Sequence, residues 1–167
     1  MAERKSATPE GYNTVMPYLR VRGAAAAVEF YKKAFGAKKR MLLKMGDRVG
    51  HAEIEIGGSV IMLSDEFPEM GMVGPQALKG TSVTIALYAA DVDKTMAKAV
   101  AAGAKVTRPA TDEFYGERSG QVEDPFGHVW MIQTRIESVT PREMQKRLDK
   151  MMAEQAATPP AKKGKGT

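Results

Sequence analysis

The fold is decided by residues 51–64, whose sequence is HAEIEIGGSVIMLS. Before the two glycines, apolar and polar side chains alternate, which is typical of a strand with one buried face. His51, Glu53 and Glu55 share the polar face of this strand. Gly57-Gly58 is typical of a two-residue hairpin turn, and the apolar residues that follow it predict a second, antiparallel strand.

The pattern around this hairpin predicts a strand, a helix and three strands, an order that occurs twice. Ala27, Val28 and Tyr31 lie at helical spacing, and Gly36 ends the first helix. Asp91 is a typical N-cap for the second helix. The predicted strands are 14–21, 38–45, 51–56 and 59–64 in the first half, and 81–89, 104–107, 121–123 and 128–135 in the second.

A short repeat relates the two halves. Gly36-Ala37-Lys38 and Gly103-Ala104-Lys105 both follow a predicted helix. This match, together with the common order of elements, indicates a duplication. We therefore predict an α+β fold with two βαβββ modules, at residues 12–66 and 81–137, followed by a C-terminal helix.

The ends of the chain differ from this body. The segment 138–155 begins with Thr140-Pro141-Arg142-Glu143, which combines a capping residue, a proline for the first turn and a capping-box glutamate. It predicts a terminal helix from residue 141 to about 154, whose apolar stripe packs on the body or on a partner subunit. Residues 1–11 are mostly polar and residues 156–167 have no large apolar side chain, so we expect both tails to be disordered.

The composition excludes several kinds of site. The 167-residue chain has no cysteine, which rules out disulfides, thiolate metal sites and a cysteine nucleophile, and it has only two histidines. Lys162, Lys163 and Lys165 supply +3 of the formal charge of +5, so the body is nearly neutral and we expect no nucleic-acid partner. No apolar run is long enough to span a bilayer and no signal peptide is recognisable, so we expect a cytoplasmic protein without a membrane partner.

Four motifs resemble one known family: PYLRVRGAAAAVEFYKKAFGAK, GHAEIEIGGSVIMLSDE, FYGERSG and VEDPFGHVW. Over residues 12–137 the chain is similar to the glyoxalase/bleomycin resistance/dioxygenase group, also called the vicinal oxygen chelate superfamily, and most of all to its PhnB-like branch. The resemblance implies that the two modules form curved mixed sheets around a cavity, and that a homodimer completes this cavity. It implies no particular activity, because isomerases, dioxygenases and drug-sequestering proteins share this fold.

The metal positions of this family fall on poor metal ligands. Metal-binding members take a His, Glu or Gln ligand from each of four strands, and these positions correspond to Met16, Met62, Thr84 and Met131. A thioether is a soft ligand that suits copper(I) far better than zinc, nickel, iron or manganese. We therefore expect no metal cofactor, and we interpret the methionines either as the floor of an adaptable ligand pocket or as core filling. A divalent metal held by other residues stays open as an alternative.

Further candidates come from residue chemistry and from the resemblance. His51 and Glu53 are candidate catalytic residues, because an imidazole beside a carboxylate can act as a general base; the alternative is a solvated polar face. Tyr18 and Arg20 share a strand face, and Arg20 matches an arginine that contacts a substrate carboxylate in glutathione-using relatives; the alternative is an ion pair with an acid. The FYGERSG segment lies at the cavity rim in the family, which adds two contact residues. The ligand-binding candidates are Met16, Tyr18, Arg20, Met62, Thr84, Tyr115, Arg118 and Met131.

Two functions are therefore predicted as alternatives. The first is a metal-free, dimeric protein that binds a small organic ligand in its cavity, as bleomycin-resistance proteins do. The second is a metal-dependent lyase, isomerase or dioxygenase of the same superfamily, with metal ligands at unusual positions. The sequence leaves open whether the protein is an enzyme.

Overall fold

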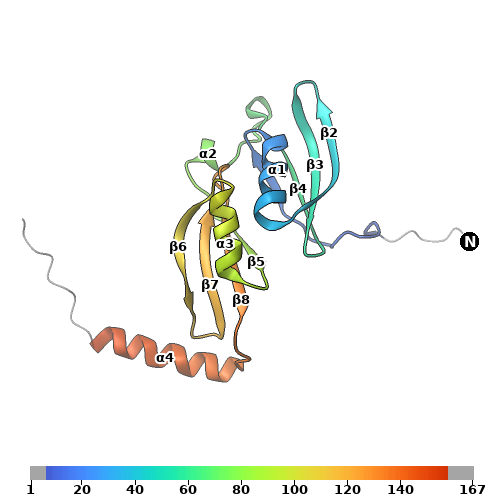
Figure 1. The fold of residues 1–167 in the computed structure, drawn as a ribbon. Coiled ribbons are helices and arrows are strands. Elements are labelled where there is room, and N and C mark those ends of the chain that lie inside the picture. The colour runs from blue at the N-terminus through green and yellow to red at the C-terminus, as the bar shows by residue number, and fades with distance from the viewer. Residues whose placement is uncertain (1–6, 158–167) are drawn as a thin grey trace, which may run out of the picture.

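The protein consists of two four-stranded mixed sheets and the helices that connect and follow them (Figure 1). A computed structural model describes residues 7–157. The first sheet has the order β1-β4-β3-β2 and contains β1 (Tyr18–Val21), β2 (Lys38–Met45), β3 (Arg48–Ile56) and β4 (Ser59–Asp65). The second has the order β5-β8-β7-β6 and contains β5 (Thr84–Tyr88), β6 (Lys105–Asp112), β7 (Glu117–Glu123) and β8 (Val129–Arg135). Since the two sheets repeat one topology, the predicted α+β fold with two βαβββ modules is confirmed.

Two helices begin and end where the sequence predicts. Helix α1 (Ala24–Phe35) ends at Gly36, whose φ of 69° is left-handed and therefore favours glycine. Helix α3 (Val92–Ala101) begins after Asp91, whose Oδ1 accepts a hydrogen bond of 3.0 Å from the Lys94 N–H. The two helices contact each other where the modules meet. The connection between the modules contains the 3₁₀ helix η1 (Pro68–Met70) and the short helix α2 (Pro75–Leu78).

A buried carboxylate joins the two modules. Asp124, in the turn before β8, accepts hydrogen bonds of 2.8 Å from the Tyr31 hydroxyl of α1 and 2.9 Å from Trp130 Nε1. Its other oxygen accepts the backbone N–H groups of Phe126 and His128. Burial and the neighbouring carboxylate raise the pKa of Tyr31 well above its usual range, so this phenol stays protonated and remains a donor. The contact between the modules therefore depends on the Asp124 carboxylate, which accepts all four hydrogen bonds.

Five strand predictions are wrong by three or more residues at one end. Strand β3 already begins at Arg48, which pairs with Met45 across the turn, and β5 is shorter than the predicted 81–89. The predicted strand 14–21 begins only at Tyr18, and Val15 is 85% exposed. The preceding proline lacks an N–H, and residues 13–17, which bend at positions 14 and 15 and which we call the arm, belong to no strand. Strands β6 and β7 are longer than predicted, and β6 continues through Pro109. This proline is tolerated because β6 is an edge strand with register irregularities.

The C-terminal helix α4 (Pro141–Ala157) extends away from the second sheet (Figure 1). It starts as predicted, with the Glu143 N–H donating to Thr140 Oγ1 at 3.3 Å, and it runs three residues past the predicted end. None of its residues is buried. Within residues 7–157 no helix is long and apolar enough to cross a membrane. The disorder predicted for both tails concerns mainly residues 1–6 and 158–167, which lie outside the described residues.

Candidate functional site

The candidate site lies on the face of the first sheet that is turned away from α1, which we call the open face. Leu19 and Leu63 are buried in the core, so Tyr18 and Met62, their neighbours along the strands, lie on the opposite side. Tyr18 pairs with Met62 in parallel register, and Met62 pairs with Glu53 in antiparallel register. The open face therefore brings together residues of β1, β3 and β4 that the sequence analysis selected.

A chain of hydrogen bonds runs across this face. The Tyr18 hydroxyl lies 2.9 Å from His51 Nδ1, and His51 Nε2 lies 3.1 Å from Glu53 Oε1. The other oxygen of Glu53 accepts a hydrogen bond of 2.7 Å from the Tyr12 hydroxyl. Arg40, on β2, has its Nε 4.0 Å from the same oxygen, and its guanidinium lies over the Tyr12 ring. Tyr12, Tyr18, His51, Glu53 and Arg40 form what we call the relay network.

The charge of Glu53 orders this network. Burial raises the pKa of this carboxyl, but hydrogen bonds from Tyr12 and His51 and the positive charge of Arg40 oppose burial, and the pKa is lowered overall. Glu53 is therefore a carboxylate at neutral pH and can only accept hydrogen bonds. His51 must then carry its proton on Nε2, and in the neutral ring Nδ1 accepts from the Tyr18 hydroxyl. The same carboxylate raises the pKa of Tyr12 through the hydrogen bond between them.

Arg20 lies beside the exposed end of the network. Its guanidinium carbon is 4.2 Å from the centre of the Tyr18 ring, and its Nη1 donates to Ser64 Oγ. Among the described residues, neither Glu53 nor Glu55 forms the ion pair with Arg20 that was the alternative interpretation. Tyr18 and Arg20 also line a hollow of about 270 Å³ beneath the connection that contains α2. The cationic side chain is thus close to a space that can hold a small ligand.

The residues at the family's metal positions do not fit a metal. Met16 lies in the arm, Met62 in β4, Thr84 in β5 and Met131 in β8, and none of them offers a hard donor atom. Across residues 7–157, no group of three or more His, Asp or Glu side chains is arranged to hold an ion. His51 and Glu53 bind each other, and Tyr12 occupies the second carboxylate oxygen. These side chains therefore do not fit the divalent metal that other members of the family bind.

The two remaining candidates lie apart from the open face of the first sheet. Tyr115 lines a hollow of about 340 Å³ together with Tyr88 of β5 and Met144 of α4. Arg118 donates two hydrogen bonds to Asp93 of α3, one of 2.8 Å from Nε and one of 2.9 Å from Nη2. It donates a third, of 2.9 Å, to Asp112. Because these carboxylates occupy its guanidinium, Arg118 is left out of the candidate site.

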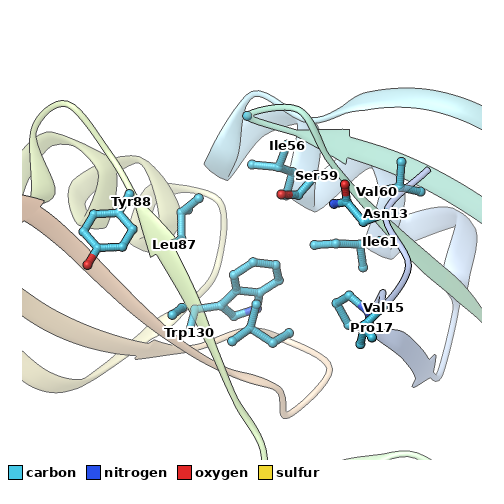
Figure 2. A pocket seen from close by; sticks show the side chains of 13 residues that line it. Asn13, Val15, Pro17, Ile56, Ser59, Val60, Ile61, Leu87, Tyr88 and Trp130 are labelled. Atoms are coloured by element: carbon cyan, nitrogen blue, oxygen red, sulfur yellow. The ribbon is translucent and has the colours of Figure 1, made fainter. Parts of the chain in front are cut away.

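A further cavity was not predicted. It has a volume of about 440 Å³ and lies between the β3–β4 hairpin of the first module and β5 and β8 of the second (Figure 2). Its walls are Asn13, Val15, Pro17, Ile56, Gly57, Ser59, Val60, Ile61, Ile85, Ala86, Leu87, Tyr88 and Trp130, none of which is among the predicted site residues. The arm forms part of this wall. The cavity was not predicted because residues 14–17 were expected to be part of a strand. The proline before Tyr18 was the signal that the strand starts later.

Known proteins of one family share this sequence and fold. The model of the Glyoxalase/Bleomycin resistance protein/Dioxygenase superfamily matches residues 11–132, and the chain belongs to this superfamily. An uncharacterized protein of Mycobacterium tuberculosis, Rv0887c, is 39% identical over 133 residues, which cover 77% of this chain and 78% of that protein. An uncharacterized protein of Arabidopsis thaliana, At5g48480, is 32% identical over 122 residues, which cover 68% of this chain and 73% of that protein.

Solved structures agree with this assignment. The X-ray structure of At5g48480 superimposes with a TM-score of 0.60 at 30% identity, over 72% of this chain and 98% of the other. A PhnB protein from Bacillus cereus superimposes with a TM-score of 0.59 over 73% of this chain and 99% of the other. At 16% identity, this second likeness concerns the fold alone. The predicted family resemblance, including PhnB proteins among the structural neighbours, is confirmed.

Proposed function

We propose that this protein binds a small organic ligand on the open face of its first sheet, without a metal, in the cytoplasm. The observation that carries the proposal is the hydrogen-bonded Tyr18–His51–Glu53 chain on a face that is accessible to solvent. Polar groups that converge beside a hollow are typical of small-molecule sites. Met62 adds an adaptable apolar contact to the same face.

The proposed assembly is a homodimer in which a second copy completes the site. Met41 and Leu43 of β2 pair in register with Glu53 and His51, so both lie on the open face, and both are exposed. Apolar side chains that border a polar site in this way favour burial against another surface. A partner that covers them would also lie over His51 and Glu53, the residues with which they pair.

Light scattering tests the dimer. We expect a particle of twice the 18.1 kDa chain mass at micromolar concentration. Leu43→Asp should weaken the dimer, because it places a charge in the proposed interface, whereas Met70→Asp, at another exposed position, should not. A monomer that persists at high concentration would contradict this part of the proposal.

Metal analysis and a ligand screen test the site. Elemental analysis of untagged protein should find no stoichiometric divalent metal. A metal that is lost on His51→Ala would instead support a metal-dependent lyase, isomerase or dioxygenase.

In a thermal-shift screen of small organic compounds, we expect stabilising compounds whose effect is lost in Tyr18→Phe and kept in Arg118→Gln. A screen without any stabilising compound would count against the binding function.

A further inference from the structure

We propose that Tyr18, His51 and Glu53 form a proton relay through which the open face binds a weakly acidic hydroxyl compound, such as a phenol or an enol, as its oxyanion. This inference rests on the proposed small-molecule site and assigns the chemical class of its ligand. It requires that the three groups are connected, that the outer one is reachable, and that the resulting charges are stabilised.

The three side chains are connected one after another by hydrogen bonds. Tyr18 Oη, His51 Nδ1, His51 Nε2 and Glu53 Oε1 follow one another at 2.9 Å and 3.1 Å across the two hydrogen bonds. Both distances are within the usual range for hydrogen bonds. As in the serine, histidine and aspartate arrangement of hydrolases, a carboxylate on the far side holds the imidazole in one tautomer. Here the group at the near side is a phenol.

Accessibility falls steadily along the relay. Tyr18 is 42% exposed, the His51 side chain is 26% exposed and the Glu53 side chain is 5% exposed. A ligand can therefore reach the tyrosine hydroxyl, while the carboxylate stays fixed beneath it. Tyr12 and Arg40 hold Glu53 from the other side, which keeps its position independent of the ligand.

The proton transfer balances without a cofactor. The ligand hydroxyl gives its proton to Tyr18 Oη while the Tyr18 O–H gives its own proton to His51 Nδ1. Only O–H bonds break, one new O–H and one new N–H bond form, and no electron is transferred. The products are a ligand oxyanion, a neutral Tyr18 and a His51 imidazolium that donates to the Glu53 carboxylate.

Both new charges have a partner. The imidazolium is paired with Glu53, and the oxyanion lies near Arg20, whose guanidinium stacks on the Tyr18 ring. The other strands add no competing acid at this point, because β2 and β4 contribute Leu43 and Met62 to the same face. A hydroxyl compound of moderate acidity therefore fits better than a strong acid, which would arrive already ionised and leave the relay unused.

The test uses 4-nitrophenol, because its phenol and phenolate absorb at different wavelengths. The protein is added to the dye at a pH equal to the dye's own pKa, where the phenol and phenolate forms of the free dye are equally populated. We expect the phenolate band to rise in a saturable manner, with the acid dissociation constant of the bound dye increased about tenfold or more. Tyr18→Phe and His51→Gln should abolish the increase. Glu55→Gln, which alters a carboxylate on the same face outside the relay network, should leave it intact.

The outcomes separate the relay from the proposed function. If equilibrium dialysis shows that the dye binds but stays neutral, the relay is wrong and the binding site is unaffected. If the dye does not bind while other compounds from the thermal-shift screen do, the assigned ligand class is wrong. If no compound binds at all, the proposed function fails together with the relay.

A second measurement needs no ligand. The ¹⁵N chemical shifts of the imidazole show which nitrogen carries the proton, and the His51→Gln variant identifies the signals, since His128 is the only other histidine. We expect neutral His51 to carry its proton on Nε2, and Glu53→Gln to mix the two tautomers. A proton on Nδ1 in the unaltered protein would overturn the relay, because that nitrogen must accept from Tyr18.

Discussion

The two modules have the same strand order, but their open faces carry different chemistry. In the first module, Glu53 pairs with Met62 and belongs to the relay network. In the second module, Gln121 pairs with Met131 and takes the place of that glutamate. Two residues before it, Ser119 takes the place of His51, and its Oγ accepts a hydrogen bond of 2.8 Å from Arg108.

The difference extends to the strand next to these residues, which carries Tyr18 in the first module. Tyr18 pairs with Met62 in the first module, whereas Ala86 pairs with Met131 in the second. The first module therefore carries an acid–base chain where the second carries a serine, a glutamine and an alanine. The two modules provide equivalent backbone positions, and the side chains at those positions decide whether a chain of tyrosine, histidine and glutamate hydrogen bonds forms. The fold by itself is a poor guide to the activity of either half.

The largest expected effect comes from breaking the joint that holds the modules together. Asp124→Ala should lower the free energy of unfolding by about 3 kcal/mol or more, because Tyr31 and Trp130 each become a buried donor without an acceptor. Urea denaturation measures this change. Asp47→Ala, in an exposed turn, is the matched control. A loss below about 1 kcal/mol would mean that the joint depends on apolar packing rather than on this carboxylate.

The next effect compares equivalent positions in the two modules. Glu53→Gln should destabilise the protein by about 1–3 kcal/mol, because Tyr12 and His51 lose a charged acceptor. Gln121→Glu at the equivalent position of the second module should change stability by no more than about 0.5 kcal/mol. Urea denaturation of both variants measures the difference. An equal loss of stability in the two variants would contradict the difference between Glu53 and Gln121 that their contacts indicate.

Acid should affect the first module before the second, because Glu53 and Glu66 are buried, whereas the carboxyls of the second module whose pKa is lowered are exposed and contribute less to stability. Glu66 is held like Glu53: its pKa is lowered by the Gly74 N–H and by Arg22, although burial opposes this. A carboxyl whose folded-state pKa lies below its usual 4.5 contributes stability above that pH, and this stability is lost as the pH falls through the folded-state value. Each unit by which the pKa is lowered corresponds to about 1.4 kcal/mol.

Two-dimensional NMR spectra recorded during an acid titration measure this order of events. Below pH 4.5, signals of the first sheet should weaken while those of the second sheet persist. Glu53→Gln should remove part of this difference, because the amide does not titrate. Simultaneous loss of both sets of signals would contradict a separate acid response.

The smallest effect concerns an arginine of the second module. Arg118→Gln should cost no more than about 1 kcal/mol, because its ion pairs with Asp93 and Asp112 are at the surface. It should also leave the thermal shift caused by any ligand unchanged. If the shift disappears in this variant, Arg118 contacts the ligand, as the family resemblance implies, and the site extends onto the second module.

Much of the fold could be predicted because its signals are local. Gly36 and Asp91 mark helix ends through contacts with residues only a few positions away. The alternation in β3 shows its two faces directly. Strand β6 could not be predicted to its end, because only its position at the edge of the sheet allows Pro109 within it.

The candidate site could be predicted only in part. His51 and Glu53 could be predicted because they share the polar face of one strand, and Tyr18 and Arg20 because they share a face of another. The part played by Tyr12 was not predicted, since it lies at the start of a module in a segment without periodicity. The cavity between the modules was also missed, because its walls come from segments that no local pattern connects.

The two modules, their helices, the faces of β3 and the lack of hard ligands at the family's metal positions can all be predicted without a structure. The contacts of Tyr18 with His51 and of Tyr12 with Glu53, across 33 and 41 residues of chain, are visible only in the folded protein. The physical reason is that strand periodicity depends on neighbours in sequence, whereas a hydrogen bond between strands depends on register. Register follows from the packing of whole sheets, which a linear pattern does not contain.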